Sequence, residues 1–194
     1  MHLKKWAALL LCLPLLGTLA GCSAQEPGAS ALSSPVSSNA AANANVTVVI
    51  PSVILEGANV EQTKKKAYSS GVAQVTENDD GSLTYQMTQN VYDRMAESTK
   101  KDLQRLLASF QAGTDFPSIK EAKADEGYQS IVLLADRAAY QSGYDSAALS
   151  TVGVSAVLYQ VFHGVSSQAV SVTVTLEDAA TGERFGTYTY PMDA

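Results

Sequence analysis

The stretch SAALSTVGVSAVLYQVF, residues 146–162, contains no charged side chain. Asp145 precedes it as a candidate helix cap, and His163 and Gly164 follow it as a candidate helix end. A membrane-spanning helix needs about 20 predominantly apolar residues, whereas this stretch is shorter and contains several Ser, Thr and Gln residues. We therefore expect a helix buried against a sheet, with Gly153 allowing a close approach and His163 capping the last carbonyl groups.

Strand patterns surround this helix on both sides. Two candidate strands precede it at residues 118–124 and 128–135, and two follow it at 169–178 and 183–190. The strand at 128–135 has a continuous apolar run, which predicts a central position in the sheet. The last two are joined by a short turn and form a hairpin.

The region before these strands has a similar mixture of elements. A strand is expected from residue 46 to about residue 51, a helix between Asn59 and Gly71, and a hairpin from strands 72–76 and 82–88. A long amphipathic helix should then continue to about residue 111. Its apolar face would contain Tyr92, Met95, Thr99, Leu103, Leu106 and Phe110. The order β-α-β-β-α-β-β-α-β-β predicts an α+β, two-layer sandwich with a largely antiparallel sheet and about three helices on one face.

The first residues have the pattern of an export signal. Lys4 and Lys5 precede an apolar run at 6–19 that Pro14 interrupts, so the run is too short to span a bilayer. The tetrapeptide LAGC at 19–22 resembles the lipobox of bacterial lipoproteins at all four positions. This resemblance implies that Cys22 is lipidated and becomes the first residue after cleavage. The alternative is ordinary secretion with cleavage after Ala20.

Three segments follow from these patterns. Residues 1–21 are the expected signal peptide, and 22–45 are the lipidated Cys22 and a flexible tether rich in Ser, Ala and Asn. Residues 46–194 are the expected single globular domain. The protein would be held by lipid on the extracytoplasmic face of a cell membrane.

The charge balance disfavours nucleic acid as a partner. The chain has 13 Lys and Arg against 19 Asp and Glu, a formal charge of −6, and loss of the signal lysines would make it more acidic.

Few residues in the expected domain could support catalysis. It contains no cysteine and only one histidine, His163, so a Ser-His-Asp triad and a typical zinc site are not expected. No nucleotide-binding glycine motif is present, and no cofactor or metal is predicted. The acidic pairs at 79–80, 125–126 and 177–178 are interpreted as turn formers, with calcium binding as the alternative.

Several segments together resemble a known group of proteins. They are VTVVIPSVILEG (46–57), NDDGSLTYQM (78–87), FPSIK (116–120), YQVFHG (159–164) and DAATGE (178–183). The pattern is similar to that of small Gram-positive lipoproteins that are loosely labelled as like the N-terminal part of streptococcal surface antigen I/II. The resemblance implies surface display and an α+β fold, and it implies no activity and no functional residues.

The C-terminal hairpin provides a candidate binding face. If Asp178 lies opposite Glu183, then Leu176 faces Phe185 and the opposite charges of Glu177 and Arg184 meet. This register places five polar or aromatic residues together on the outer face, away from the helices: Ser171, Thr173, Thr175, Tyr188 and Tyr190. Such a face could bind an extracellular protein or a glycan, or it could be an ordinary solvated surface.

Three classes of function remain open from the sequence. The first is a membrane-anchored surface lipoprotein that presents a non-catalytic binding domain. The second is a structural or accessory lipoprotein of the envelope or of a transporter. The third is an enzyme, such as a hydrolase, for which the sequence provides no motif.

Overall fold

The computed structural model describes residues 46–143 and 145–191. The expected signal peptide, Cys22 and the expected tether lie outside the described residues.

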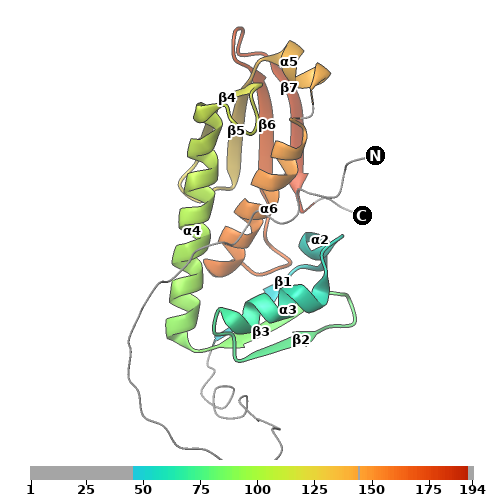
Figure 1. The fold of residues 1–194 in the computed structure, drawn as a ribbon, viewed down its shortest axis with the longest axis vertical. Helices are drawn as coiled ribbons and strands as arrows, with labels where there is room; N and C mark the ends of the chain where they lie inside the picture. Colours follow the sequence, from blue (N-terminus) through green and yellow to red (C-terminus); the bar gives the residue numbers. More distant parts are fainter. Residues whose placement is uncertain (1–45, 144, 192–194) are drawn as a thin grey trace, which may run out of the picture. The chain divides into compact units, whose positions relative to one another are not determined.

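The described strands form two sheets (Figure 1). The first has the order β1-β3-β2 and is antiparallel, and the second has the order β4-β5-β6-β7. Only β5 and β6 pair in parallel. Their bounds are β1 (Val46–Ile50), β2 (Gln74–Glu77), β3 (Leu83–Met87), β4 (Ile119–Ala124), β5 (Ser130–Ala135), β6 (Val172–Asp178) and β7 (Arg184–Tyr190). The α+β class and the largely antiparallel pairing are therefore confirmed.

The five described helices match the sequence pattern, with two short additions. They are α2 (Ser52–Leu55), α3 (Val60–Ser69), α4 (Gln89–Ala112), α5 (Arg137–Ser142) and α6 (Ala147–Phe162), of which α2 and α5 were not predicted. The Asn59 side chain accepts a hydrogen bond from the Gln62 amide at 3.0 Å and so caps α3, as its position before the helix suggests. Gly113, with a φ of 65°, ends α4.

The prediction of one sheet was wrong because α4 is long. Its 24 residues extend over about 36 Å at the usual helical rise. The chain leaves β3 at one end of α4 and enters β4 at the other end. β4 consequently pairs with later strands and not with the first hairpin.

Helix α6 is buried, as its lack of charge predicts. Nine of its 16 residues are buried, including Val152 and Ala156, while Val154 and Leu158 are partly exposed. The helix contacts α4, both β6 and β7, and also β1. Figure 1 shows α4 and α6 covering one face of the second sheet. Within residues 46–143 and 145–191, no helix has both the length and the apolar character that a membrane-crossing segment requires.

The predicted apolar face of α4 is the face that packs into the core. Leu103 is 0% exposed and Phe110 is 1% exposed, while Leu106 is only partly buried. The spacing of apolar residues by three and four positions therefore predicted the buried face of α4 correctly.

Truncating Leu103 to Ala should lower the free energy of unfolding by about 2–5 kcal/mol because it leaves a cavity in the core. Chemical denaturation would measure this change. Gln104→Ala is the matched control, since the neighbouring Gln104 is exposed and should change stability by less than about 0.5 kcal/mol. Equal effects of the two substitutions would contradict the orientation of α4.

Candidate functional site

The register of the β6–β7 hairpin decides where the proposed binding residues lie. Glu177 pairs with Arg184 as predicted, and 3.8 Å separates the Glu177 Oε1 and Arg184 Nη2 atoms. The register then shifts by one residue, because Leu176 pairs with Gly186 and not with Phe185. A β-bulge therefore lies at the start of β7.

This bulge overturns the predicted single binding face. Tyr188 pairs with Val174 and Tyr190 pairs with Val172, so both tyrosines share the helix-covered face with these buried valines. Thr173 alternates with them and lies on the opposite face.

Thr175 shares the face of Thr173, and Ser171 lies just before β6. The five predicted residues therefore do not form one surface. A one-residue shift moves every later side chain to the other side of the sheet.

The sequence contained one signal for the bulge. Gly186 interrupts the strand pattern, and glycine inside a strand often marks a bulge. A Cβ atom at Gly186 would lie 3.0 Å from the Tyr188 side chain and 3.1 Å from Leu176. The absence of a side chain there lets β7 change register.

Tyr190 belongs to the core. It is only 5% exposed, and its ring packs on Gly153 of α6. An added Cβ atom at Gly153 would lie 2.4 Å from the ring. Burial raises the pKa of Tyr190, and a hydrogen bond with Ser150 partly opposes this effect.

Tyr188 lies beside Tyr190 and remains 38% exposed. Tyr140 of α5 is close enough to Tyr188 and Tyr190 to interact with them electrostatically. Its ring also meets the Phe185 ring edge-on, with 5.8 Å between the ring centroids. The Tyr140 hydroxyl is buried and has no hydrogen-bond partner among the described residues. Burial, followed by the nearby Tyr188, raises the pKa of Tyr140 to about 12.

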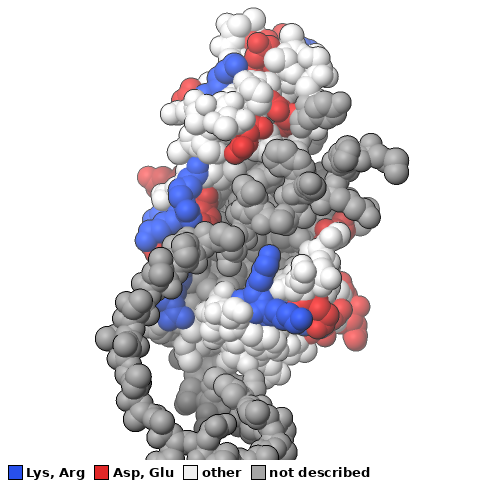
Figure 2. Space-filling model, in the orientation of Figure 1, with Lys and Arg blue, Asp and Glu red and all other residues white. Residues whose placement is uncertain are grey.

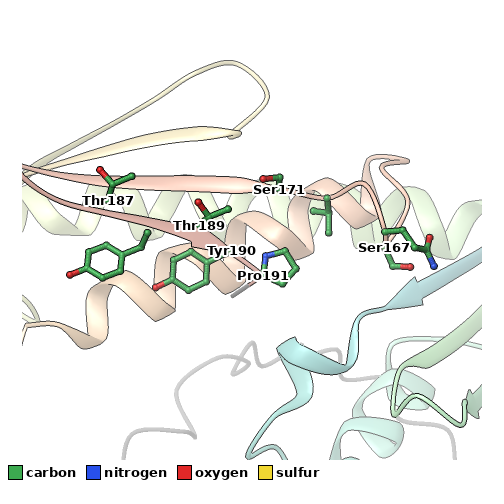
Figure 3. A pocket seen from close by; sticks show the side chains of 9 residues that line it. Ser167, Ser171, Thr187, Thr189, Tyr190 and Pro191 are labelled. Atoms are coloured by element: carbon green, nitrogen blue, oxygen red, sulfur yellow. The ribbon is translucent and has the colours of Figure 1, made fainter. Parts of the chain in front are cut away.

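An open groove of about 550 Å³ runs beside the C-terminal half of β7 (Figure 3). It lies between β7 and the segment that leads into β6, and the described residues that line it are all uncharged. They are Ser167, Gln168, Val170, Ser171, Thr187, Tyr188, Thr189, Tyr190 and Pro191. Figure 3 shows the Thr187 and Thr189 side chains on one side of β7 and the Tyr190 ring on the side of α6. Three of the predicted binding residues thus line the groove, and Thr173 and Thr175 do not.

A buried glutamine fixes one wall of this groove. Gln160 of α6 is 2% exposed, and its side-chain amide donates to the Tyr128 and Ser171 carbonyl oxygens at 3.3 and 3.2 Å. Its side-chain oxygen also accepts a hydrogen bond from the Ser171 amide at 3.4 Å. The segment before β6 is therefore attached to the core helix.

His163 ends α6 as predicted. Its Nδ1 atom lies 2.7 Å from the Tyr159 carbonyl oxygen, and its ring stacks on the Tyr159 ring with centroids 3.9 Å apart. The side chain therefore satisfies a carbonyl group in the last turn.

One aspartate of each acidic pair accepts hydrogen bonds from backbone amides in its own turn. Asp80 accepts hydrogen bonds from the Ser82 amide and hydroxyl, which lower the pKa of Asp80, and Asp125 accepts from the Gln129 amide at 2.7 Å. Asp178 accepts from the Ala180 amide at 2.8 Å. No group of three or more His, Cys, Asp or Glu residues able to hold a metal ion is found in the described part of the chain.

Charge is dispersed on the visible surface. Figure 2 shows Lys and Arg side chains interspersed with Asp and Glu over the described residues on this face of the molecule. For example, the Lys64 Nζ atom lies 3.2 Å from Glu61 Oε1 and 2.8 Å from Glu77 Oε2.

Comparisons of this chain with protein-family models, with curated proteins and with solved structures give no match. The possible role of the groove therefore follows from its own residues.

The contact between α6 and β7 can be tested by Gly153→Ala. We expect the added methyl group to lower the free energy of unfolding by about 1–3 kcal/mol, because it overlaps the Tyr190 ring. Chemical denaturation of Gly153→Ala in the wild-type and Tyr190→Leu backgrounds would measure the coupling between the two positions. The cost should be smaller when the ring is absent. Equal costs in both backgrounds would show that the ring does not press on Gly153.

Proposed function

We propose that this protein is a lipid-anchored surface protein that presents a non-catalytic interaction domain outside the cell membrane. The LAGC tetrapeptide at 19–22 supports the anchor, because it resembles the lipobox of bacterial lipoproteins and this resemblance implies lipidation at Cys22. Two acyl chains hold a protein on a bilayer much more firmly than one.

The groove beside β7 is the observation that carries the interaction role. It combines a strand at the edge of its sheet, the exposed ring of Tyr188 and the hydroxyl groups of Thr187 and Thr189, and none of its described lining residues is charged. A tyrosine ring offers a large contact area at a low cost in conformational entropy. An uncharged groove also avoids the free-energy cost of removing water from charged groups on binding.

The anchor predicts the fate of a Cys22→Ser variant. Without the thiol, neither lipidation nor the cleavage that follows it should occur, so the variant should accumulate as the full-length precursor. Intact mass of membrane-extracted protein would show the difference. Cys12→Ser is the control, because Cys12 lies inside the apolar run and should not affect lipidation. Wild-type protein without added acyl mass at Cys22 would contradict the proposed anchor.

Cysteine labelling can test location and interaction together. A lipidated Cys22 has no free thiol, so a single new cysteine in the domain can be detected with a membrane-impermeant maleimide. Thr187→Cys reports on the groove, and Gln104→Cys reports on the exposed side of α4.

We expect Gln104→Cys to react on intact cells as it does in the purified, dilute protein. Thr187→Cys should react in the dilute protein and be protected on the cells that produce it, because a partner covers the groove. Absence of labelling at Gln104→Cys on intact cells would refute the location. Equal labelling of Thr187→Cys in both settings would refute the interaction role of the groove.

A further inference from the structure

Among residues 46–143 and 145–191, two positions on the outer edge of β7 have no backbone hydrogen-bond partner. The Thr173 amide donates to the Gln129 carbonyl oxygen at 2.8 Å, so Thr173 directs its backbone groups towards the β5 side. Backbone direction alternates along a strand, and Val172 and Val174 consequently direct theirs towards β7. Their partners Tyr190 and Tyr188 use their N–H and C=O groups on β6. Thr187 and Thr189 therefore point their N–H and C=O groups away from the sheet.

Two other described sheet edges carry features that block pairing. At β2, the outward amide of Val75 donates to the Tyr68 hydroxyl at 3.3 Å. At β4, the register is irregular between Ile119 and Glu121, and Lys123 lies on the strand, 3.7 Å from the Glu121 carboxylate. Bulges and lysines are common means of preventing edge-to-edge association. No described strand pairs with the outer edge of β7, and its residues 185–191 are uncharged.

The sequence of this edge is complementary to itself. Thr187, Tyr188 and Thr189 read the same in both directions. If two copies pair antiparallel about Tyr188, Thr187 of each copy lies opposite Thr189 of the other. These are the two residues whose backbone groups point outward, so the pairing forms four hydrogen bonds. Threonine pairs on neighbouring strands are also favourable.

The charge and the ends of the strand favour the same arrangement. The chain has a formal charge of −6, which opposes self-association through most of its surface, but no charged residue lies between Arg184 and Pro191. The bulge at the start of β7 and Pro191 after its end, which lacks an N–H group, limit the ladder to its centre.

We infer that β7 pairs antiparallel with β7 of a second copy of this chain, centred on Tyr188, and joins the two four-stranded sheets into one. This inference rests on the proposed interaction role of β7, whose residues 187–190 line the groove, and names the partner. Four hydrogen bonds give a weak, reversible dimer in solution. Anchoring both copies in one membrane would raise their effective concentration and favour the pair.

Disulfide cross-linking of the anchored protein tests the register. Tyr188 faces Tyr188 of the second copy at a non-hydrogen-bonded position, where Cβ atoms are about 4.5–5.5 Å apart. Tyr188→Cys should therefore form a dimer of twice the chain mass under mild oxidation, and a reductant should reverse it. Thr187→Cys is the matched control, because Thr187 faces Thr189 of the other copy and should cross-link much less. No dimer with Tyr188→Cys, or equal dimer with both variants, would overturn the inference.

A proline at position 189 tests the hydrogen bonds. Because the Thr189 amide points outward, Thr189→Pro removes a donor from each copy without removing a bond to β6. Sedimentation of the detergent-solubilised lipoprotein should show a dissociation constant raised roughly 5- to 100-fold. Thr189→Val keeps the amide and should dimerise as the wild type does. Circular dichroism would confirm that both variants remain folded.

Unchanged self-association of folded Thr189→Pro would overturn the inference, as would a wild-type chain that stays monomeric and does not cross-link on the membrane. Protection of Thr187→Cys on cells without cross-linking of Tyr188→Cys would point to a different partner in the groove. In that case this inference fails while the proposed interaction role stands. Equal labelling of Thr187→Cys on cells and in the dilute protein would instead contradict both this inference and the proposed interaction role.

Discussion

The burial of α6 is the constraint on which the rest of the described structure depends. The helix has no charged residue and buries nine of its 16 residues, most of them apolar. It packs on α4, β6, β7 and β1, and therefore holds elements of both sheets in one core. Gly153 lets the Tyr190 ring approach the helix backbone, and Gln160 ties the segment before β6 to the same helix. These contacts hold Tyr190 and Ser171, which both line the groove, against α6.

The bulge at the start of β7 determines the character of the groove. Without it, Tyr188 and Tyr190 would lie on the face opposite the helices, beside Thr173. With it, Tyr190 fills the core over α6 and Tyr188 stays partly exposed beside the strand edge. The same shift turns the backbone groups of Thr187 and Thr189 outward. A single extra residue thus moves the two tyrosines to the helix side and makes Thr187 and Thr189 the residues that direct their backbone groups to the outer edge of β7.

The described groove residues offer hydrogen-bonding and packing groups. These are hydroxyl, amide, aromatic and aliphatic groups. The sole histidine of the described residues is held at the end of α6, stacked on Tyr159. The acidic pairs in turns accept local hydrogen bonds, as side chains that stabilise turns do. These features support the proposal of an interaction domain, in which hydrogen bonding along an edge and tyrosine packing provide the contacts.

The sequence by itself determined the α+β class, the order of the longer elements, the buried face of α4, the burial of α6 and the cap at His163. Each of these follows from local periodicity or from charge, which act over one or two helical turns or along one strand. Only the tertiary structure decided that the strands divide into two sheets, because that depends on which strands pair with one another beyond the two ends of α4. It also decided the faces of Tyr188 and Tyr190. Their positions depend on how β7 pairs with β6 and on the space that Gly186 and Gly153 leave for neighbouring rings, and these contacts join residues far apart in the sequence.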